Sequence, residues 1–298
     1  MFSLLQADHR YCQSAAPDTR DYWWATAAIN GRWASRRGYA FICYCVPLTC
    51  ASAVGEVRHV AFCKLLALMH ALQSAPLASV LYLDSDVVIN RLSGFRHLLR
   101  AWAPCNGVLD QRCGDLLFGG NAPYMGPGRW HGAVLNQSCP PNSGIVLARN
   151  SNRTMRALLA WWRVPADRFA TRHAWEQRVL WQSWRRLLRL PTTLRVLADT
   201  TARVGGSCLR SMFRLPSASA LGRLPASRPV ARAPFLHLDS GSVCGIPGLA
   251  SAACAAKRRA LLAALPSARR DGVTFADGRP RVVALDVRAL NGTMKGAL

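Results

Sequence analysis

Acidic residues are scarce in this sequence of 298 residues. Asp and Glu number 15 against 38 Lys and Arg, which gives a formal net charge of +23. This imbalance could reflect an anionic partner, such as nucleic acid, an anionic membrane face or a nucleotide diphosphate. Because nearly all the positive charge is Arg and the chain is also rich in Ala, coding bias is the alternative explanation. The basic residues are dispersed in clusters as short as Arg185-Arg186, and no nucleic-acid-binding motif occurs, so we expect no nucleic acid partner.

Long apolar runs are also missing. No stretch reaches the ~18 to 20 apolar residues that a membrane span needs. Met1–Leu5 runs directly into Gln6, Asp8 and Arg10, without the basic and then apolar segment of a secretory signal. We therefore expect either a cytosolic protein or a membrane anchor that lies outside this chain.

The eleven cysteines include no C-x-x-C pair, which argues against a zinc site. Cys43 and Cys45 lie in an apolar run and are expected to be small core residues. Two other groups of cysteines could form disulfides in an oxidising lumen. Glycosylation sequons at Asn136, Asn152 and Asn291 favour the same setting, so we expect the Golgi or ER lumen. The two cysteine groups are Cys105, Cys113 and Cys139, and Cys208, Cys244 and Cys254.

Helix-like and strand-like segments alternate along the chain. Apolar periodicity predicts helices at 21–37, 55–72, 152–162 and 171–190, and continuous apolar runs predict strands at 39–46, 79–83 and 143–148. Strand, helix and strand with short connections form the pattern of a parallel sheet. The sequence therefore predicts an α/β fold with a mainly parallel central sheet flanked by helices.

We expect one large domain over residues 1–250, followed by a C-terminal extension over 251–298. The extension contains a helix and a β-hairpin at 273–286 that turns at Asp277-Gly278. The Gly- and Pro-rich stretch from Gly119 to Gly132 predicts a long loop within the large domain.

The motif Asp84-Ser85-Asp86 carries the strongest chemical signal. It directly follows the apolar strand that ends at Leu83 and precedes Val87-Val88-Ile89, and solvated surface aspartates rarely lie inside such a run. Ligands bind at the carboxyl ends of parallel strands. Two carboxylates one residue apart could there hold Mn²⁺ or Mg²⁺, which would neutralise a diphosphate leaving group. A surface turn or helix N-cap is the alternative.

The order of several motifs resembles glycosyltransferase family 34, which includes plant xyloglucan xylosyltransferases, galactomannan galactosyltransferases and yeast Golgi α-mannosyltransferases. The resemblance covers roughly residues 22 to 245. The matching segments are 30–41 ("N…YA..HGY.F"), Lys64 ahead of Leu81–Asp86 ("WLDSD"), Asn142–Asn150 ("N-T-G-…-R-N"), Glu176-Gln177 ("D-Q") and His237–Gly241 ("H-F-x-G-C").

The resemblance implies a GT-A fold, a UDP- or GDP-sugar donor, Mn²⁺, a glycan or glycoprotein acceptor, and transfer of a hexose or pentose with retention. Asp84 and Asp86 would hold the metal and the ribose-diphosphate, and His237 would be the third protein ligand. An imidazole suits Mn²⁺ beside carboxylates. Asp239 lies close behind His237 and could itself be the ligand, which would leave the histidine as a packing residue.

The same resemblance assigns donor-binding and catalytic residues. Ser85, Asn142 and Gly144 would lie against the donor, and Gln177, with Glu176 beside it, would lie beneath the reacting sugar. Lys64 would be a point charge beside a phosphate or carboxylate, although a lysine that reaches to the surface is the alternative.

The chain also departs from the family. The basic residue that follows the family's histidine is missing, so Lys64, Arg203 or Arg210 would have to neutralise the phosphates.

Three other functions compete with this reading. The broader group of plant arabinosyl- and xylosyltransferases shares "LDSDVV". A nucleic-acid-binding protein would explain the charge, and a catalytically inactive transferase fold could serve as a partner subunit.

Overall fold

The structure is a computed structural model of the chain. It describes residues 2–12, 21–52, 55–74, 79–89, 115–120, 141–167, 170–171, 175–188, 194–196, 235–237, 281–287 and 289–290.

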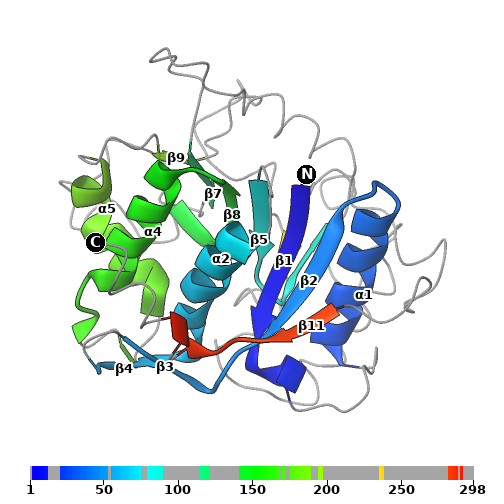
Figure 1. Ribbon diagram of the computed structural model, residues 1–298, viewed down its shortest axis with the longest axis horizontal. Helices are drawn as coiled ribbons and strands as arrows, with labels where there is room; N and C mark the ends of the chain where they lie inside the picture. Colours follow the sequence, from blue (N-terminus) through cyan, green and yellow to red (C-terminus); the bar gives the residue numbers. More distant parts are fainter. Residues whose placement is uncertain are drawn as a thin grey trace, which may run out of the picture.

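A seven-stranded sheet forms the centre of the molecule (Figure 1). All its neighbouring strands are parallel except where β8 meets β5 and β7, because β8 alone among the seven runs the opposite way. The predicted α/β fold with a mainly parallel central sheet is therefore confirmed. In sheet order the strands are β11 (Arg281–Ala284), β2 (Ala40–Cys45), β1 (Phe2–Asp8), β5 (Ser79–Leu83), β8 (Pro141–Arg149), β7 (Leu116–Gly120) and β9 (Leu194–Val196).

Strand β1 lies between β2 and β5 in the sheet, and the sequence analysis did not predict it. Leu4 and Leu5 are completely buried, one on each face of the sheet. The strand was missed because Gln6 and Asp8 interrupt its apolar pattern. Both polar side chains are buried, and both are used at the candidate site described below.

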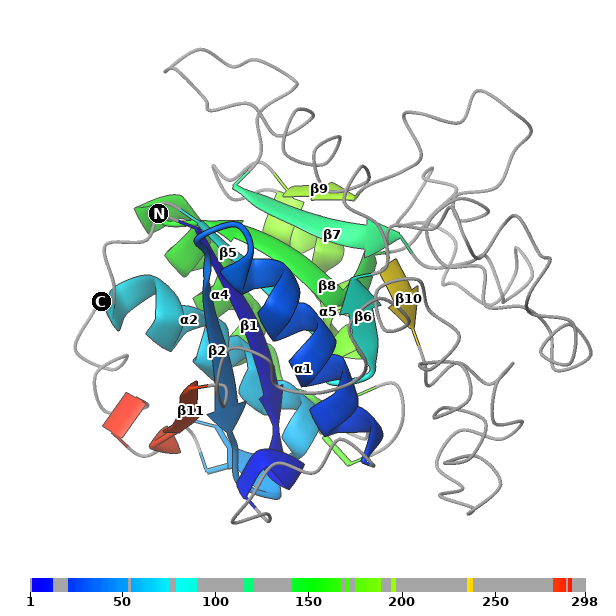
Figure 2. The same cartoon turned by 90° about the vertical axis from the view of Figure 1, so that its right-hand side faces the viewer.

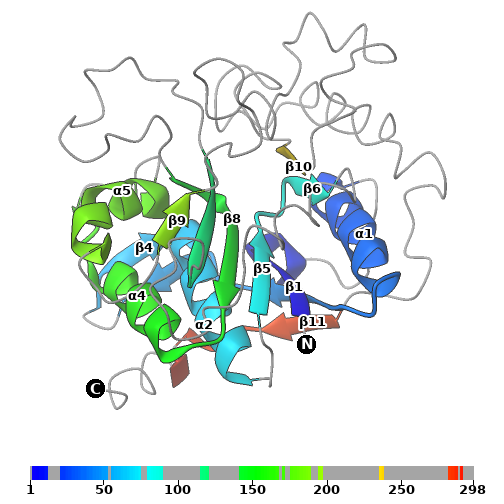
Figure 3. The same ribbon diagram turned by 90° about the horizontal axis from the view of Figure 1, so that it is seen from above.

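Helices cover both faces of the sheet (Figures 2 and 3). Helix α1 (Tyr22–Ser35) lies on one face, and α2 (Cys63–Ser74), α4 (Asn152–Arg163) and α5 (Trp175–Leu188) lie on the other. The strands alternate accordingly. In β5, Val80 and Tyr82 pack in the cluster on the α2 side, whereas Leu81 and Leu83 pack in the cluster on the α1 side. Alternate residues of a strand point to opposite faces, so a strand covered on both sides is apolar throughout.

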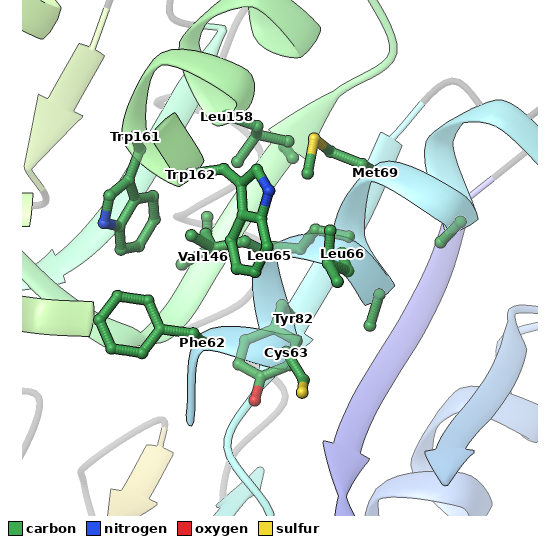
Figure 4. Packing of buried hydrophobic residues seen from close by; sticks show 14 of the residues in the cluster. Phe62, Cys63, Leu65, Leu66, Met69, Tyr82, Val146, Leu158, Trp161 and Trp162 are labelled. Atoms are coloured by element: carbon green, nitrogen blue, oxygen red, sulfur yellow. The ribbon is translucent and has the colours of Figure 1, made fainter. Parts of the chain in front are cut away.

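The larger core lies between the sheet and helices α2, α4 and α5 (Figure 4). Trp161 and Trp162 are both 1% exposed and belong to this core. Trp161 meets Phe118 of β7 edge to face, with ring centroids 5.9 Å apart. Full burial of one such aromatic side chain contributes about 3 kcal/mol or less to folding.

Two glycines set the geometry of α1. A Cβ on Gly31 would lie 3.0 Å from the ring of Phe41 in β2, so the helix approaches the sheet closely only because this side chain is absent. Gly38 has a φ of 65°, in the left-handed region, in the turn that follows the end of α1 at Ser35.

The predicted helix at 55–72 is wrong in its first part. Residues Val57–His59 form β4, which pairs antiparallel with β3 (Thr49–Ala51), and a 3-10 turn (Val60–Phe62) precedes α2. The helix starts only at Cys63. The apolar residues before Cys63 match a helical period only by coincidence. Arg58 stands among them, and its buried side chain anchors this segment by donating to the Trp162 carbonyl.

Part of the expected C-terminal extension is built into the main sheet. Strand β11 pairs in parallel with β2, with Val282 opposite Cys43. The turn expected at Asp277-Gly278 lies outside the described residues. The loop expected from Gly119 to Gly132 begins inside β7 as far as Gly120, and its remainder lies outside them too.

Two disulfides join Cys12 to Cys45 and Cys50 to Cys63. The expectation that Cys45 is a plain core residue is therefore wrong, whereas Cys43 is buried with a free thiol, as expected. The six cysteines that we expected to pair all lie outside the part of the chain that the structure describes. Within that part, no helix has the length and apolar character needed to span a membrane.

Candidate active site

The Asp84-Ser85-Asp86 turn lies at the topological switch point of the sheet, where successive crossover connections run on opposite faces. From β1 the chain passes through α1 to β2, and from β2 it passes through α2, on the opposite face, to β5. The carboxyl ends of β1 and β5 therefore lie side by side where the two crossovers diverge, and ligands of open α/β sheets bind at such a point. Asp8 ends β1, and Asp84 follows β5 directly.

Backbone hydrogen bonds close this turn. The Val87 N–H donates to the Asp84 carbonyl at 2.9 Å, and the Asp84 N–H donates to the Gly144 carbonyl at 2.8 Å. The Gln6 side-chain amide of β1 also donates to the Asp84 carbonyl, at 3.1 Å. Because β8 is antiparallel to β5, its first residues meet the carboxyl end of β5, and this brings Gly144 to the turn.

Helix α1 holds the other side of the turn. The Thr26 hydroxyl donates to the Ser85 carbonyl. The Asn30 side-chain amide donates to the Val87 carbonyl and accepts from the Ile89 N–H, both at 2.8 Å. Both side chains are completely buried, so the backbone of the turn is fixed from three sides before any ligand arrives.

Lys64 lies in the first turn of α2 and bridges two carboxylates. Its Nζ is 2.7 Å from Asp84 Oδ1 and 2.8 Å from Glu176 Oε1, and its side chain is 5% exposed. The Tyr82 hydroxyl donates to the same Asp84 oxygen at 2.8 Å. Lys64 is thus a buried point charge beside two carboxylates, and the alternative of a lysine reaching to the surface is wrong.

The charges in this cluster perturb the titration of its members. Burial alone would lower the pKa of Lys64, but the carboxylates of Asp84 and Glu176 outweigh burial and raise it well above its usual range. Burial and the neighbouring Asp84 carboxylate raise the pKa of Tyr82 far above its usual value. At neutral pH, Lys64 is therefore a fixed cation and Tyr82 a neutral hydrogen-bond donor.

Glu176 and Gln177 lie in the first turn of α5 and contact the start of β8. The Ser143 hydroxyl donates to Glu176 Oε1 at 2.7 Å, and the Ser143 N–H donates to Gln177 Oε1 at 3.1 Å. Glu176 is buried, whereas Gln177 is half-buried. A carboxylate in the first turn of a helix is favoured by the helix dipole.

Ser85 turns its side chain toward β1. Its hydroxyl donates to the Asp8 carboxylate and accepts from Arg10 Nη2 at 2.9 Å. Burial raises the pKa of Asp8, yet hydrogen bonds and the charge of Arg10 outweigh burial, and the net shift is downward. The Arg10 guanidinium also stacks on the ring of Trp23, 4.7 Å from its centroid. In this structure the Ser85 hydroxyl therefore fixes the turn to β1.

His237 lies beside the turn through its backbone. Strand β10 (Phe235–His237) pairs antiparallel with β6 (Val87–Ile89), and His237 stands opposite Val87, the residue after Asp86. Asn142 stands opposite Gly119 where β8 meets β7. The structure thus brings the sequence-predicted residues to one edge of the sheet, although the segments that carry them are up to about 170 positions apart in the sequence.

The donor set fits a hard divalent cation in part. Lys64 and Tyr82 both use Asp84 Oδ1, and no described residue hydrogen-bonds to Oδ2 of this 27% exposed side chain. Carboxylate oxygens are the ligands that Mn²⁺ and Mg²⁺ accept. Among the described residues no three His, Cys, Asp or Glu side chains cluster to hold a metal by themselves, so a bound diphosphate or another residue would have to complete the coordination.

Several residues of the site were not predicted. Gln6, Asp8 and Arg10 belong to the strand that the sequence analysis missed and to the turn after it. Asn30 begins a segment that matched the family but received no role. These residues could have been found from the sequence because they are polar at positions where a buried strand or helix normally has apolar residues.

No protein-family model matches the chain, and no curated protein matches it. Among solved structures it is similar to a glycosyltransferase involved in the glycosylation of the major capsid of PBCV-1, at 16% sequence identity, over 81% of this chain and 96% of that chain, with a TM-score of 0.48. It is similar to mouse xyloside xylosyltransferase 1 at 12% identity, over 81% and 98%, with a TM-score of 0.43. It is also similar to the galactosyltransferase LgtC at 12% identity, over 89% and 96%, with a TM-score of 0.38. All three are glycosyltransferases.

We expect Lys64→Met to lower the free energy of unfolding by about 3 kcal/mol, because it leaves the buried Glu176 carboxylate without its cation. Chemical denaturation measures this loss. The double variant Lys64→Met/Glu176→Gln should regain at least about 1 kcal/mol, since a neutral amide removes the unpaired charge.

The raised pKa of Lys64 predicts the pH dependence of this loss. Lys64 contributes its full stabilisation below its unfolded pKa of about 10.4 and loses it only above that pH. The destabilisation caused by Lys64→Met should therefore be constant from pH 6 to 9. A loss below 1 kcal/mol would contradict the assigned pairing.

Proposed function

We propose that this protein is a glycosyltransferase that transfers a hexose or pentose from a nucleotide-diphosphate sugar to a glycan or glycoprotein acceptor, with Mn²⁺ or Mg²⁺ and with retention at the anomeric carbon. The observation that carries the proposal is the position of the Asp84–Asp86 turn. It lies at the switch point of the sheet, and its backbone is held by β1, α1 and β8. Carboxylates fixed there suit a metal diphosphate.

Asp84 and Asp86 would hold the metal, and His237 would be the third protein ligand. When bound, the ion would neutralise the diphosphate as the sugar leaves. Asp84 is suited to this role because Lys64 and Tyr82 fix one of its oxygens, which orients the other. Fixed ligands need no reorganisation when the metal complex binds.

Gln177 would contact the reacting sugar with its amide, while Glu176 supports it from behind. Glu176 is buried and engaged by Lys64 and Ser143, which favours a positioning role over direct contact with the sugar. Gly144 and Asn142 would pass close to the donor at the start of β8. Two carboxylates already engage the Lys64 ammonium, so another group is needed to neutralise the phosphates.

The proposed function is tested by a panel of UDP- and GDP-sugars, each measured with and without Mn²⁺. The correct donor should raise the melting temperature of the wild type only when Mn²⁺ is present, because binding stabilises the native state by about 2.7 kcal/mol at 100 times Kd. Release of nucleotide diphosphate measures turnover. A protein that binds the donor without any turnover would be the inactive partner subunit instead.

We expect Asp86→Ala to reduce turnover at least ~100-fold while the melting temperature of the free protein stays within a few degrees of the wild type, since the change removes a metal ligand. The donor and Mn²⁺ should no longer raise the melting temperature of the variant. Near-normal turnover at saturating Mn²⁺ would refute the metal site.

His237 and Asp239 compete for the position of third ligand, and matched variants separate them. We expect His237→Ala to weaken Mn²⁺ activation about 10-fold or more, the typical loss when a supporting group of a metal site is removed. Mn²⁺ activation curves check both variants. If only Asp239→Asn shifts the metal midpoint, the aspartate is the ligand.

We also propose that the protein works in the Golgi or ER lumen. The two disulfides support this, because disulfides persist in oxidising compartments. Asn152, in the sequon Asn152-Arg153-Thr154, is exposed at the start of α4, where a glycan would meet solvent.

When the chain is expressed through a eukaryotic secretory pathway, we expect a glycan on Asn152. Peptide mass spectrometry before and after treatment with peptide N-glycosidase would locate it, and Asn152→Gln should remove it without changing the melting temperature by more than a few degrees. An unmodified Asn152 in secreted, disulfide-bonded protein would count against the luminal assignment.

A further inference from the structure

The segment between β2 and α2 leads directly into the helix that carries Lys64. It contains β3, β4 and the 3-10 turn, and it ends at Cys63, the first residue of α2. Lys64 comes next, and its partner Glu176 lies in the first turn of α5. The segment therefore ends directly before Lys64, the cation of the ion pair.

Disulfide Cys50–Cys63 links the middle of β3 to the start of α2. Both cysteines are completely buried in the larger core cluster. Figure 4 shows Cys63 in that cluster together with Phe62, Tyr82 and Trp162. The covalent bond therefore anchors α2 one residue away from Lys64.

Arg58 and Glu56 tie the same segment to the end of α4. Arg58 is 1% exposed and donates to the carbonyls of Trp162 at 2.6 Å and Val164 at 3.0 Å. Its guanidinium also lies over the ring of Trp162. Glu56 binds Arg58 and accepts from the Ala166 N–H at 3.1 Å.

His59 extends this anchorage toward α5. Its N–H donates to the Ala170 carbonyl at 2.6 Å, five positions before the first residue of α5. The β3–β4 segment is therefore tied to the start of α2 through the disulfide, and through hydrogen bonds to the end of α4 and to the connection that precedes α5. Both glutamates of the chain, Glu56 and Glu176, lie in this arrangement and pair with buried cations.

We propose that the Cys50–Cys63 disulfide is a positioning element of the active site, which acts through Lys64. The terminal turn of a helix is where local opening costs least, because its first N–H groups lack partners within the helix. Lys64 lies in such a turn, and opening would withdraw its ammonium from Asp84 and Glu176. The disulfide holds this turn closed and so keeps the Asp84 carboxylate oriented. The consequence for sugar transfer rests on the function proposed above.

Lysine labelling tests this proposal without donor, metal or turnover. The only lysines of the chain are Lys64, Lys257 and Lys295, so an amine-acylating ester followed by peptide mass spectrometry reports the accessibility of Lys64 directly. We expect slow acylation of Lys64 in the wild type. Acylation should be at least ~10-fold faster in Cys50→Ala/Cys63→Ala, the ratio that corresponds to about 1.4 kcal/mol of local opening. Lys257 and Lys295 provide the reference rate of the reagent.

The control is Leu158→Ala, which creates a cavity in the same core cluster and lies on α4, an element that carries none of the three bridge residues. It should lower the melting temperature and leave the Lys64 rate unchanged at a temperature where both variants are folded. Equal acceleration in Leu158→Ala, or no acceleration in the cysteine variant, would overturn the proposal.

A second measurement serves if the cysteine variant does not fold. The wild type is reduced with a trialkylphosphine in water. The phosphine gives two electrons to each disulfide, and one water molecule supplies the oxygen of the phosphine oxide and the two protons of the thiols. Alkylation of Cys63 and acylation of Lys64 are then followed together. Rapid acylation of Lys64 once Cys63 is alkylated supports the proposal, and a slow rate on alkylated protein contradicts it. Neither labelling assay involves a sugar or a metal. A failed donor-binding experiment would therefore refute the proposed function without affecting the labelling result.

Discussion

The Lys64 ammonium between the carboxylates of Asp84 and Glu176 links the elements on the α2 side of the candidate site. It joins α2, the turn after β5 and the start of α5, and through Ser143 it reaches the first residues of β8. Removal of one member of such a buried group leaves an uncompensated charge, which typically costs about 3 to 5 kcal/mol. The arrangement is therefore stable only when all its members are present, and this requirement fixes the positions of the three elements relative to one another.

The site also explains why polar residues are buried in β1 and α1. Gln6 of β1 and Thr26 and Asn30 of α1 are buried, and each uses its side chain to hold a backbone group at the Asp84–Asp86 turn. A buried polar group is costly without partners, but with them it specifies a single geometry. The turn is consequently formed in advance, which is the condition for carboxylates that act on a charged substrate without reorganisation.

Part of this architecture could be predicted from the sequence, and part could not. Strand β5 and the motif after it were predictable because four apolar residues, Val80 to Leu83, lead directly into Asp84. Strand β1 was missed because Gln6 and Asp8, whose side chains hydrogen-bond at the site, interrupt its apolar pattern. The start of α2 was misplaced because the period of a short apolar segment does not distinguish a strand from a helix. The Lys64 bridge depends on contacts between residues more than 100 positions apart, which no local pattern encodes.

The central claim is that the Asp84–Asp86 turn holds a divalent cation beside a nucleotide diphosphate. Crystals grown with Mn²⁺ and a nucleotide diphosphate test it directly, because anomalous diffraction locates manganese without reference to any fold. The account predicts one strong anomalous peak within about 2.3 Å of a carboxylate oxygen of Asp84 or Asp86, with a diphosphate oxygen in the same coordination shell. Bound nucleotide with no manganese at this turn, or manganese bound only elsewhere, would contradict it.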